Sequence, residues 1–248
     1  MERNILLELE YLGTEYFGFQ IQEKRSKNEM TIQGALEQAL KKLFKEKIRV
    51  AASGRTDRGV HARAQVVNFK TNSRIPLTNI KIALNSFLPS DIRVIRAKKV
   101  PLDFHARFSA KHKRYRYIIR NAKEFSVFWN NFAWQIAEPL NLVKIEKITK
   151  KLIGKRDFGL FAKEAKKYRD CLRIVNSITI KKRGSLIYID IEANGFLRNM
   201  VRNIVSFLVK VARDKISLKQ ASLILEQKAP YMNKPAPATG LYLYKVSY

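Results

Sequence analysis

The sequence predicts an α/β protein built from two tandem split-βαβ halves, and three observations lead to this class. Some segments alternate apolar and polar side chains with the period of two typical of strands. Others repeat apolar side chains every three to four residues, as amphipathic helices do. These segments follow the order strand, helix, strand, strand, helix, strand, and the order occurs twice. We therefore place a boundary near residue 104, between halves at residues 1–104 and 105–248.

The first half begins with residues 4–12, in which leucines alternate with glutamates as expected for a strand with one buried face. Thr31 stands where it can cap a helix over residues 31–45, whose apolar side chains follow the 3.6-residue period. The other elements expected in this half are strands at residues 48–53, 65–71 and 92–100, and a helix at residues 78–87.

The second half repeats this order with longer insertions. Residues 113–121 are predicted to form a strand, and residues 173–182 and 186–194 a hairpin with its turn at Gly184. The longest helix is predicted over residues 196–212, where seven apolar side chains share one face. Shorter helices at residues 142–153 and 217–226 and a closing strand at residues 240–248 complete the half.

The charge balance indicates a polyanionic partner. The chain has 49 Lys and Arg against 21 Asp and Glu, which gives a net charge of +28. Such an excess repels itself unless a polyanion neutralises part of it, and RNA, DNA and anionic membrane surfaces are the candidates. Basic stretches interleaved with aromatic side chains favour a nucleic acid. A lysine-rich composition of the helix faces also accounts for part of the charge.

The sequence predicts no metal site, cofactor site or membrane span. Cys171 is the only cysteine, and the three histidines do not fall at metal-ligand spacing with cysteines or acids. The first three residues carry charge, which is unlike a secretory signal peptide. No apolar run approaches the ~20 residues that a membrane-spanning helix requires. A cytoplasmic location is therefore expected.

The stretch GRTDRGVHA, residues 54–62, concentrates charge and backbone freedom in a short space. Asp57 stands between Arg55 and Arg58, and a glycine lies on either side of the group. Neighbouring positive charge favours an ionised carboxylate, so Asp57 is a candidate base or nucleophile rather than an acid. A solvated turn between two strands would use the same residues, and position alone does not separate the two interpretations.

Residues 104–117, FHARFSAKHKRYRY, interleave basic and aromatic side chains. The basic side chains can meet phosphates, and the aromatic rings can stack on bases. In a strand, Tyr115 and Tyr117 would share one face, and we prefer a core-facing position for Tyr117. The candidate phosphate ligands in this stretch are Arg107, Lys111, Lys113, Arg114 and Arg116.

Two further segments have unusual composition. Residues 11–20, YLGTEYFGFQ, are aromatic and interrupted by glycines, which fits either a compact surface loop or a ligand loop. In residues 194–205, Arg198 and Arg202 are four positions apart on an otherwise apolar predicted helix. A buried arginine is costly without a carboxylate partner, and Asp57 is an economical partner for one of the two.

Six motifs follow one another in an order typical of one family, from residue 11 to residue 248. They are YLGTEYFGFQ, SGRTDRGVHARAQVVNF, LNSFLPSDI, FHARFSAKHKRYRYIIRN, NGFLRNMVRNIV and APATGLYLYKVSY. Together they strongly resemble the A-type (TruA family) tRNA pseudouridine synthases. The resemblance implies two α/β halves joined in one mostly antiparallel sheet, with a basic cleft between them. The first half would carry the catalytic aspartate loop, and the second would complete the cleft.

The resemblance also implies an activity, the isomerisation of uridine to pseudouridine at positions 38, 39 and 40 in the anticodon stem-loop of tRNA, by a homodimer that needs no cofactor. Asp57 matches the catalytic aspartate, acting as nucleophile or base. Arg55 matches the arginine that displaces the target base, Tyr115 the tyrosine that stacks on the uracil, and Arg202 the arginine that pairs with the carboxylate. Arg58 stands where the family often has alanine, which adds charge and a candidate RNA contact beside Asp57.

Three other classes of protein are open to test. A non-catalytic RNA-binding protein of two RRM-like units would explain the charge and the aromatic rings, but not an acid set among arginines. A methyltransferase would need a glycine-rich cofactor loop after its first strand, and the glycine spacing of residues 11–20 does not match one. A DNA-binding protein would need a recognition helix, and no segment has the pattern of one.

Overall fold

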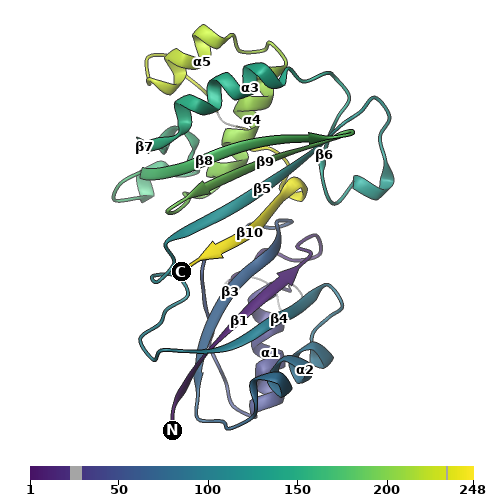
Figure 1. Cartoon of the computed structure of the whole chain (residues 1–248), viewed down its shortest axis with the longest axis vertical. Helices are drawn as coiled ribbons and strands as arrows, with labels where there is room; N and C mark the ends of the chain where they lie inside the picture. The colour runs from purple at the N-terminus through teal and green to yellow at the C-terminus, as the bar shows by residue number, and fades with distance from the viewer. Residues whose placement is uncertain (23–29, 233) are drawn as a thin grey trace. The chain divides into compact units, whose positions relative to one another are not determined.

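The computed structural model describes residues 1–22, 30–232 and 234–248, and the chain divides into two compact units (Figure 1). Unit 1 comprises Met1–Lys111 together with Tyr242–Tyr248, and unit 2 comprises His112–Leu241. The division falls after residue 111, whereas the sequence predicts a boundary near residue 104. Residues 104–106 pack on the sheet of unit 1, and the closing strand returns to the same unit, so neither belongs with the second compact body.

Unit 1 has the element order expected for the first half. Its elements are β1 (Arg3–Tyr11), α1 (Ile32–Phe44), β2 (Ala51–Ala52), β3 (His61–Thr71), α2 (Leu77–Phe87), β4 (Ile92–Val100) and, from the end of the chain, β10 (Leu241–Ser247). Strand β1 lies between β3 and β4 and runs antiparallel to both, while β10 pairs in parallel with β3. The Thr31 hydroxyl accepts the Gly34 N–H at 3.1 Å and caps α1, as the sequence predicts.

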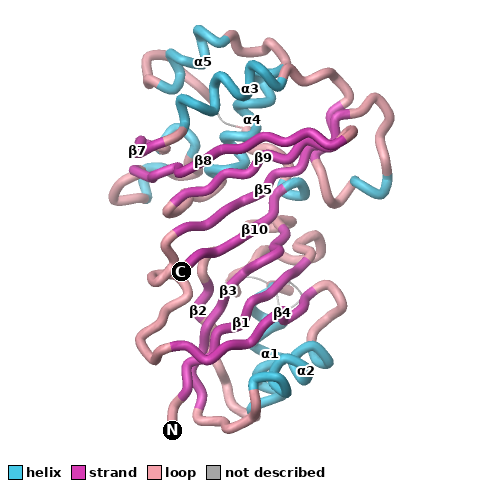
Figure 2. The backbone as a smooth tube through the Cα atoms, viewed as in Figure 1, coloured by secondary structure: helices cyan, strands magenta, loops and turns pink. Residues whose placement is uncertain are grey.

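The strand expected at residues 48–53 is much shorter than predicted. Only Ala51 and Ala52 pair with β3, and Figure 2 shows β2 as a short strand beside it. The Val50 N–H donates instead to the Glu37 carboxylate on α1 at 3.1 Å, so this part of the chain is held by the helix. Strand β3, in contrast, begins at His61, within the GRTDRGVHA stretch and before the predicted start at residue 65.

The core of unit 1 lies between its sheet and its two helices, which cover one face of the sheet (Figure 1). The fully buried side chains there include Ile5, Leu7, Leu9, Leu36, Leu40, Ile80 and Leu84. A smaller cluster on the opposite face contains Leu6, Val66 and Ala106, with Phe104 packed against it. Phe104, one of the aromatic residues in 104–117 that can stack on bases, contacts the Tyr248 ring at 4.9 Å between centroids and packs against this cluster.

Unit 2 contains the remaining strands and helices. Its elements are β5 (His112–Asn121), β6 (Trp134–Ile136), α3 (Leu142–Thr149), β7 (Gly154–Asp157), β8 (Leu172–Arg183), β9 (Leu186–Ala193), α4 (Met200–Ala212) and α5 (Leu218–Leu225). Strand β9 lies between β5 and β8 and runs antiparallel to both. The expected hairpin is confirmed, with Gly184 at a φ of 56° in its turn. Both units are thus mixed α/β bodies with mostly antiparallel pairing, in tandem along the chain.

Three features of unit 2 differ from the sequence prediction. The short strands β6 and β7 were not expected, and they pair with β5 and β8 respectively. Helix α3 ends at Thr149, and a single 3₁₀ turn continues to Leu152. Helix α4 begins at Met200 instead of residue 196, because Asn199 has a left-handed φ of 62° that a right-handed helix cannot include. Among the described residues, no helix is long and apolar enough to cross a membrane.

Candidate active site

Residues 53–60, which include Asp57, form the loop between β2 and β3 of unit 1. Asp57 is half-buried there, while Arg55 and Arg58 are exposed. The Val60 N–H donates to the Asp57 carbonyl at 3.2 Å across a turn in which Gly59 has a φ of 77°. A left-handed φ of this kind favours glycine. The loop therefore carries a half-buried aspartate between two exposed arginines along the chain.

The glycine-interrupted segment that follows β1 packs directly against this loop. A side chain at Gly13 would lie 2.0 Å from the Val60 carbonyl oxygen, and one at Gly18 would lie 2.8 Å from the Thr56 carbonyl oxygen. Gly18 also has a φ of 87°. The Phe19 N–H donates to the same Thr56 carbonyl at 3.0 Å. The two glycines thus permit a close backbone approach that supports the loop carrying the acid.

A buried hydrogen-bond network lies beside the loop. The Tyr11 hydroxyl and Thr56 Oγ1 are 2.8 Å apart, and the Gln65 amide donates to the Gly54 carbonyl at 2.8 Å. The Ser53 hydroxyl donates to Gln65 Oε1 at 2.7 Å. The exposed fractions of Tyr11, Ser53, Thr56 and Gln65 lie between 0% and 6%. Burial raises the pKa of Tyr11 to about 12, so its hydroxyl remains protonated at neutral pH.

Several basic side chains of unit 1 are exposed together with aromatic rings. The Arg58 guanidinium lies 4.2 Å from the centroid of the Phe17 ring. Farther along the chain, the Arg107 guanidinium lies 5.5 Å from the ring of Phe108, which is 76% exposed, and Lys111 is exposed as well. Guanidinium and aromatic groups in contact can present both a charge to a phosphate and a flat surface to a base.

The two tyrosines of β5 lie on one face of the strand but have different surroundings. Tyr115 is 9% exposed and makes an edge-to-face contact with Phe196, at 4.9 Å between centroids. Tyr117 is fully buried, and its hydroxyl donates to the Pro237 carbonyl at 2.7 Å. A side chain at Gly240 would lie 2.7 Å from the Tyr117 ring. The core-facing position expected for Tyr117 is confirmed, and burial raises the pKa of its hydroxyl well above the ordinary value.

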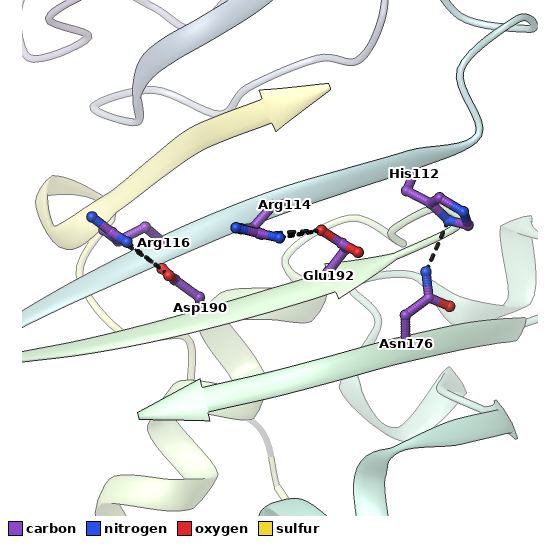
Figure 3. Close-up of polar contacts among 6 residues, drawn as sticks. All are labelled: His112, Arg114, Arg116, Asn176, Asp190 and Glu192. Carbon is purple, nitrogen blue, oxygen red and sulfur yellow. Dashed lines mark hydrogen bonds and ion pairs between the residues drawn. The ribbon is translucent and has the colours of Figure 1, made fainter. Parts of the chain in front are cut away.

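The neighbouring arginines of β5 are on the opposite face and form ion pairs with β9. Arg114 donates through Nε and Nη2 to one oxygen of Glu192, at 3.0 and 2.7 Å. Arg116 and Asp190 make a two-fold contact with both distances at 2.7 Å (Figure 3). Each pair joins residues directly opposite each other in the β5–β9 register. The Glu192 carboxylate therefore balances the charge of Arg114, which the sequence predicts to be a phosphate ligand. Lys113, the residue before Arg114, is half-buried.

The two arginines expected on one face of the long helix are placed differently. Because α4 begins after Asn199, Arg198 lies in the preceding turn, and its N–H donates to the Tyr168 hydroxyl at 2.9 Å. Arg202 lies within α4 and is half-buried. Its Nε donates to the Ala236 carbonyl at 2.6 Å, and the Ala236 N–H donates to the Arg202 carbonyl at 3.1 Å. Arg202 therefore binds the segment that leads into β10. Of the two arginines, Arg202 lies in the helix as the sequence predicts, and Arg198 does not.

The residues singled out from the sequence divide between the two units. Unit 1 contains Arg55, Asp57, Arg58, Arg107 and Lys111, and unit 2 contains Lys113, Arg114, Tyr115 and Arg202. The pairing of Asp57 with Arg202 stays a prediction. In the part of the chain that the structure describes, no three His, Cys, Asp or Glu side chains gather in a group that could hold a metal ion.

Sequence reasoning missed the contribution of Ser53 and Gln65 to this site. Both are completely buried. Gln65 donates to the Gly54 carbonyl in the loop that carries Asp57, and Ser53, at the start of that loop, donates to Gln65. A signal was present, since Gln65 directly precedes Val66 and Val67 in β3 and a buried glutamine requires hydrogen-bond partners. The partners themselves could not be identified, because Tyr11 is 54 positions away in the chain.

Known proteins are similar to this chain over nearly its whole length. A family model described as tRNA pseudouridine synthase matches residues 9–109 and 148–248. A protein of Thermoanaerobacter sp. (strain X514) named tRNA pseudouridine synthase A is 44% identical over 247 residues, which cover 99% of this chain and 100% of the relative. Proteins with the same name from Caldicellulosiruptor bescii and Halalkalibacterium halodurans are 41% and 40% identical, covering 99% and 96% of this chain and 100% and 90% of their own lengths. With a family model over most of its length and relatives of this similarity, the chain belongs to the tRNA pseudouridine synthase family.

Proposed function

We propose that this chain isomerises uridine to pseudouridine at positions 38, 39 and 40 in the anticodon stem-loop of tRNA. The C1′–N1 bond of the nucleotide breaks, the uracil turns, and a C1′–C5 bond forms. One proton leaves C5 and one is gained at N1, so the reaction balances without an oxidant, a reductant or a co-substrate. The observation that carries this proposal is the anchored loop in which Asp57 lies between two exposed arginines.

Each group of the candidate site has a task in this reaction. Asp57 supplies the reactive carboxylate, as a nucleophile or as a base that removes a sugar proton. Arg55 holds the target base out of its stack, a step that exposes the otherwise shielded glycosidic bond. Tyr115 stacks on the uracil and assists proton removal from C5. Arg202 pairs with the carboxylate and keeps it ionised and oriented.

The basic surface binds the RNA backbone in this proposal. Arg58, Arg107, Lys111 and Lys113 contact phosphates or stacked bases, and Arg114 contributes through a charge that Glu192 already balances in part. By analogy with the family, the proposal extends to a homodimer in the cytoplasm. Light scattering of the purified protein with and without tRNA measures the oligomeric state directly.

The activity is tested with purified protein and a tRNA transcript in buffer without added cofactor. Isomerisation does not change the mass of the RNA, so pseudouridine is detected as a carbodiimide adduct that stops primer extension. We expect stops at positions 38 to 40 and none with transcripts whose uridines there are replaced by cytidine. A non-catalytic RNA-binding protein would bind the transcript and leave no adduct, and that result would overturn the proposal.

Tyr115 is expected to affect chemistry more strongly than Tyr117. Tyr115→Phe keeps the ring and tests the hydroxyl, and we expect a fall of about 10²-fold in the single-turnover rate if the hydroxyl assists proton transfer. Tyr115→Leu removes the stacking ring as well and should be slower still. The matched control is Tyr117→Phe, which breaks the hydrogen bond to Pro237 and should lower stability with a near-normal rate in the folded protein. A larger rate loss at Tyr117 than at Tyr115, in equally folded variants, would reverse the assignment.

Binding of tRNA is expected to weaken steeply with salt. For ~6–10 neutralised phosphates, the affinity should fall by roughly 10³–10⁵ between 50 and 200 mM salt. The measurement is the slope of the logarithm of affinity against the logarithm of salt concentration. A flat dependence would mean that the +28 charge mainly reflects lysine-rich composition.

Arg55 is expected to behave differently from the general basic surface. Arg55→Ala should lower the single-turnover rate at saturating tRNA, because the side chain acts during base displacement. The comparison variant, Lys111→Ala with Lys113→Ala, should reduce the salt slope and leave the saturated rate nearly unchanged. An Arg55→Ala protein that binds more weakly but turns over normally at saturation would make Arg55 one more phosphate contact.

A further inference from the structure

The orientation of the Gln65 side-chain amide is determined by its backbone partners. Oε1 accepts the Val66 N–H at 3.1 Å, a contact that only the oxygen can make. Nε2 donates to the Gly54 carbonyl at 2.8 Å, which only the nitrogen can do. The Ser53 hydroxyl adds a second donor to Oε1 at 2.7 Å. Gln65 is completely buried, so these bonds have no competition from solvent.

From Gln65 the network continues to the residue that precedes Asp57. Gln65 Nε2 also donates, at a longer 3.5 Å, to the Tyr11 hydroxyl oxygen. The Tyr11 hydroxyl then shares a hydrogen bond of 2.8 Å with Thr56 Oγ1. Burial raises the pKa of Tyr11 to about 12, so its hydroxyl stays protonated at neutral pH.

The network therefore binds the loop at Gly54 and Thr56, the two residues on either side of Arg55. Gln65 binds Gly54 on one side of Arg55, and Tyr11 binds Thr56 between Arg55 and Asp57. The backbone at Thr56 is held as well, because its carbonyl accepts the Phe19 N–H. A reacting group displaced by about 1 Å can lose 10²-fold in rate, so a loop bound at these points is suited to a carboxylate that must meet a flipped nucleotide.

We propose that Tyr11, Thr56 and Gln65 are positioning residues that set the orientation of Asp57 for the reaction. The inference rests on the proposed function, in which Asp57 is the reactive group. It goes beyond that function by assigning a role in the rate of chemistry to three side chains that do not reach the substrate. Their hydroxyl and amide groups act through the loop backbone, so they should influence turnover and leave tRNA binding largely unaffected.

The test removes single hydroxyl groups and keeps the shape of the side chain. Thr56→Val and Tyr11→Phe should each lower the single-turnover rate at saturating tRNA, by about tenfold or more, with dissociation constants for tRNA within about threefold of the wild-type value. Thr56→Ser restores the hydroxyl and should return the rate to within about threefold of wild type. The double variant should lose less than the product of the single losses, because both changes break the same contact.

Matched controls carry the same chemical changes elsewhere in unit 1. Thr71 is 4% exposed and donates to Glu46 at 3.0 Å, so Thr71→Val removes a similarly buried hydroxyl on β3. The Tyr248 hydroxyl donates to the Ala106 carbonyl at 2.9 Å, and Tyr248→Phe is the counterpart of Tyr11→Phe. Both controls should keep the wild-type rate even where their melting temperatures fall.

The outcomes separate this inference from the proposed function. Wild-type rates in folded Thr56→Val and Tyr11→Phe, or a Thr56→Ser protein as slow as Thr56→Val, overturn the positioning role. The positioning role is also overturned if Thr56→Val and Tyr11→Phe lose no more rate than control variants with the same melting temperature. If Thr56→Val does not fold, Tyr11→Phe decides the question, because it removes only one oxygen atom from a ring that stays packed. Failure of the proposed function would instead appear as a folded wild-type protein that forms no pseudouridine, and a fully active Asp57→Asn variant would remove Asp57 as the reactive group.

Discussion

Asp57→Asn is expected to abolish pseudouridine formation while the protein stays folded and retains most of its affinity for tRNA. The amide has nearly the volume of the carboxylate, so the half-buried loop can accept it without rearrangement. It lacks the negative charge and basicity that either role of Asp57 requires, so we expect a rate loss of at least about 10⁴-fold. The measurements are single-turnover carbodiimide detection, filter binding of tRNA and the melting temperature.

The control for this substitution is Asp103→Asn, which makes the same change at an exposed position of unit 1. It should leave all three measurements near the wild-type values. Residual activity of Asp57→Asn within tenfold of wild type would remove Asp57 from the mechanism. A variant that has lost tRNA binding to the same extent as turnover would indicate that Asp57 acts in recognition.

Arg202→Met is expected to have the second-largest effect, a loss of about 10²–10³-fold in rate, because it removes the positive charge that is predicted to hold the reactive carboxylate. Methionine preserves the packing volume on a helix whose other residues are nearly all buried. Leaving a carboxylate unpaired costs about 3–5 kcal/mol at full burial, and solvent access to the half-buried Arg202 reduces that cost. The measurements are the single-turnover rate and the free energy of unfolding in urea.

Arg202 also donates to the Ala236 carbonyl, so its contribution through Asp57 must be separated from this local hydrogen bond. A double-mutant cycle with Asp57→Asn does so, since the bond to Ala236 is lost equally with and without the carboxylate. We expect a coupling free energy of unfolding of about 1–3 kcal/mol between Asp57 and Arg202. A coupling free energy near zero would show that Arg202 acts only through its hydrogen bond to Ala236.

The sequence patterns located most of the elements because each pattern has a local physical cause. Alternation in residues 4–12 and the 3.6-residue period after Thr31 correspond to β1 and α1. In these segments the side chains that must be buried are regularly spaced, so the period alone identifies the element. The same reasoning separated Tyr115 and Tyr117 from the arginines between them, since neighbouring side chains of a strand point to opposite faces.

Element ends were predicted less well because they depend on single residues and on partners distant in the chain. The apolar period continues across Asn199, but one left-handed backbone angle there moves the start of α4 to Met200. Residues 48–53, IRVAAS, resemble a strand, yet Glu37 of α1 binds the Val50 N–H and only Ala51 and Ala52 pair with β3. The contact with Glu37 has no signal within residues 48–53, and the apolar period of residues 196–212 does not show the left-handed angle at Asn199.

By itself, the sequence determined the α/β class, the two tandem halves, the loop with Asp57 and the motifs of the family, because these follow from local periodicity and from residue types at close spacing. Only the tertiary structure decided what the side chains around the site bind. It joined Tyr11, Thr56 and Gln65 in one buried network, and it paired Arg114 with Glu192 across 78 positions of chain. Such partners depend on strand register and on how far each group is removed from water. These quantities arise only when distant segments pack together, so no window of the sequence contains them.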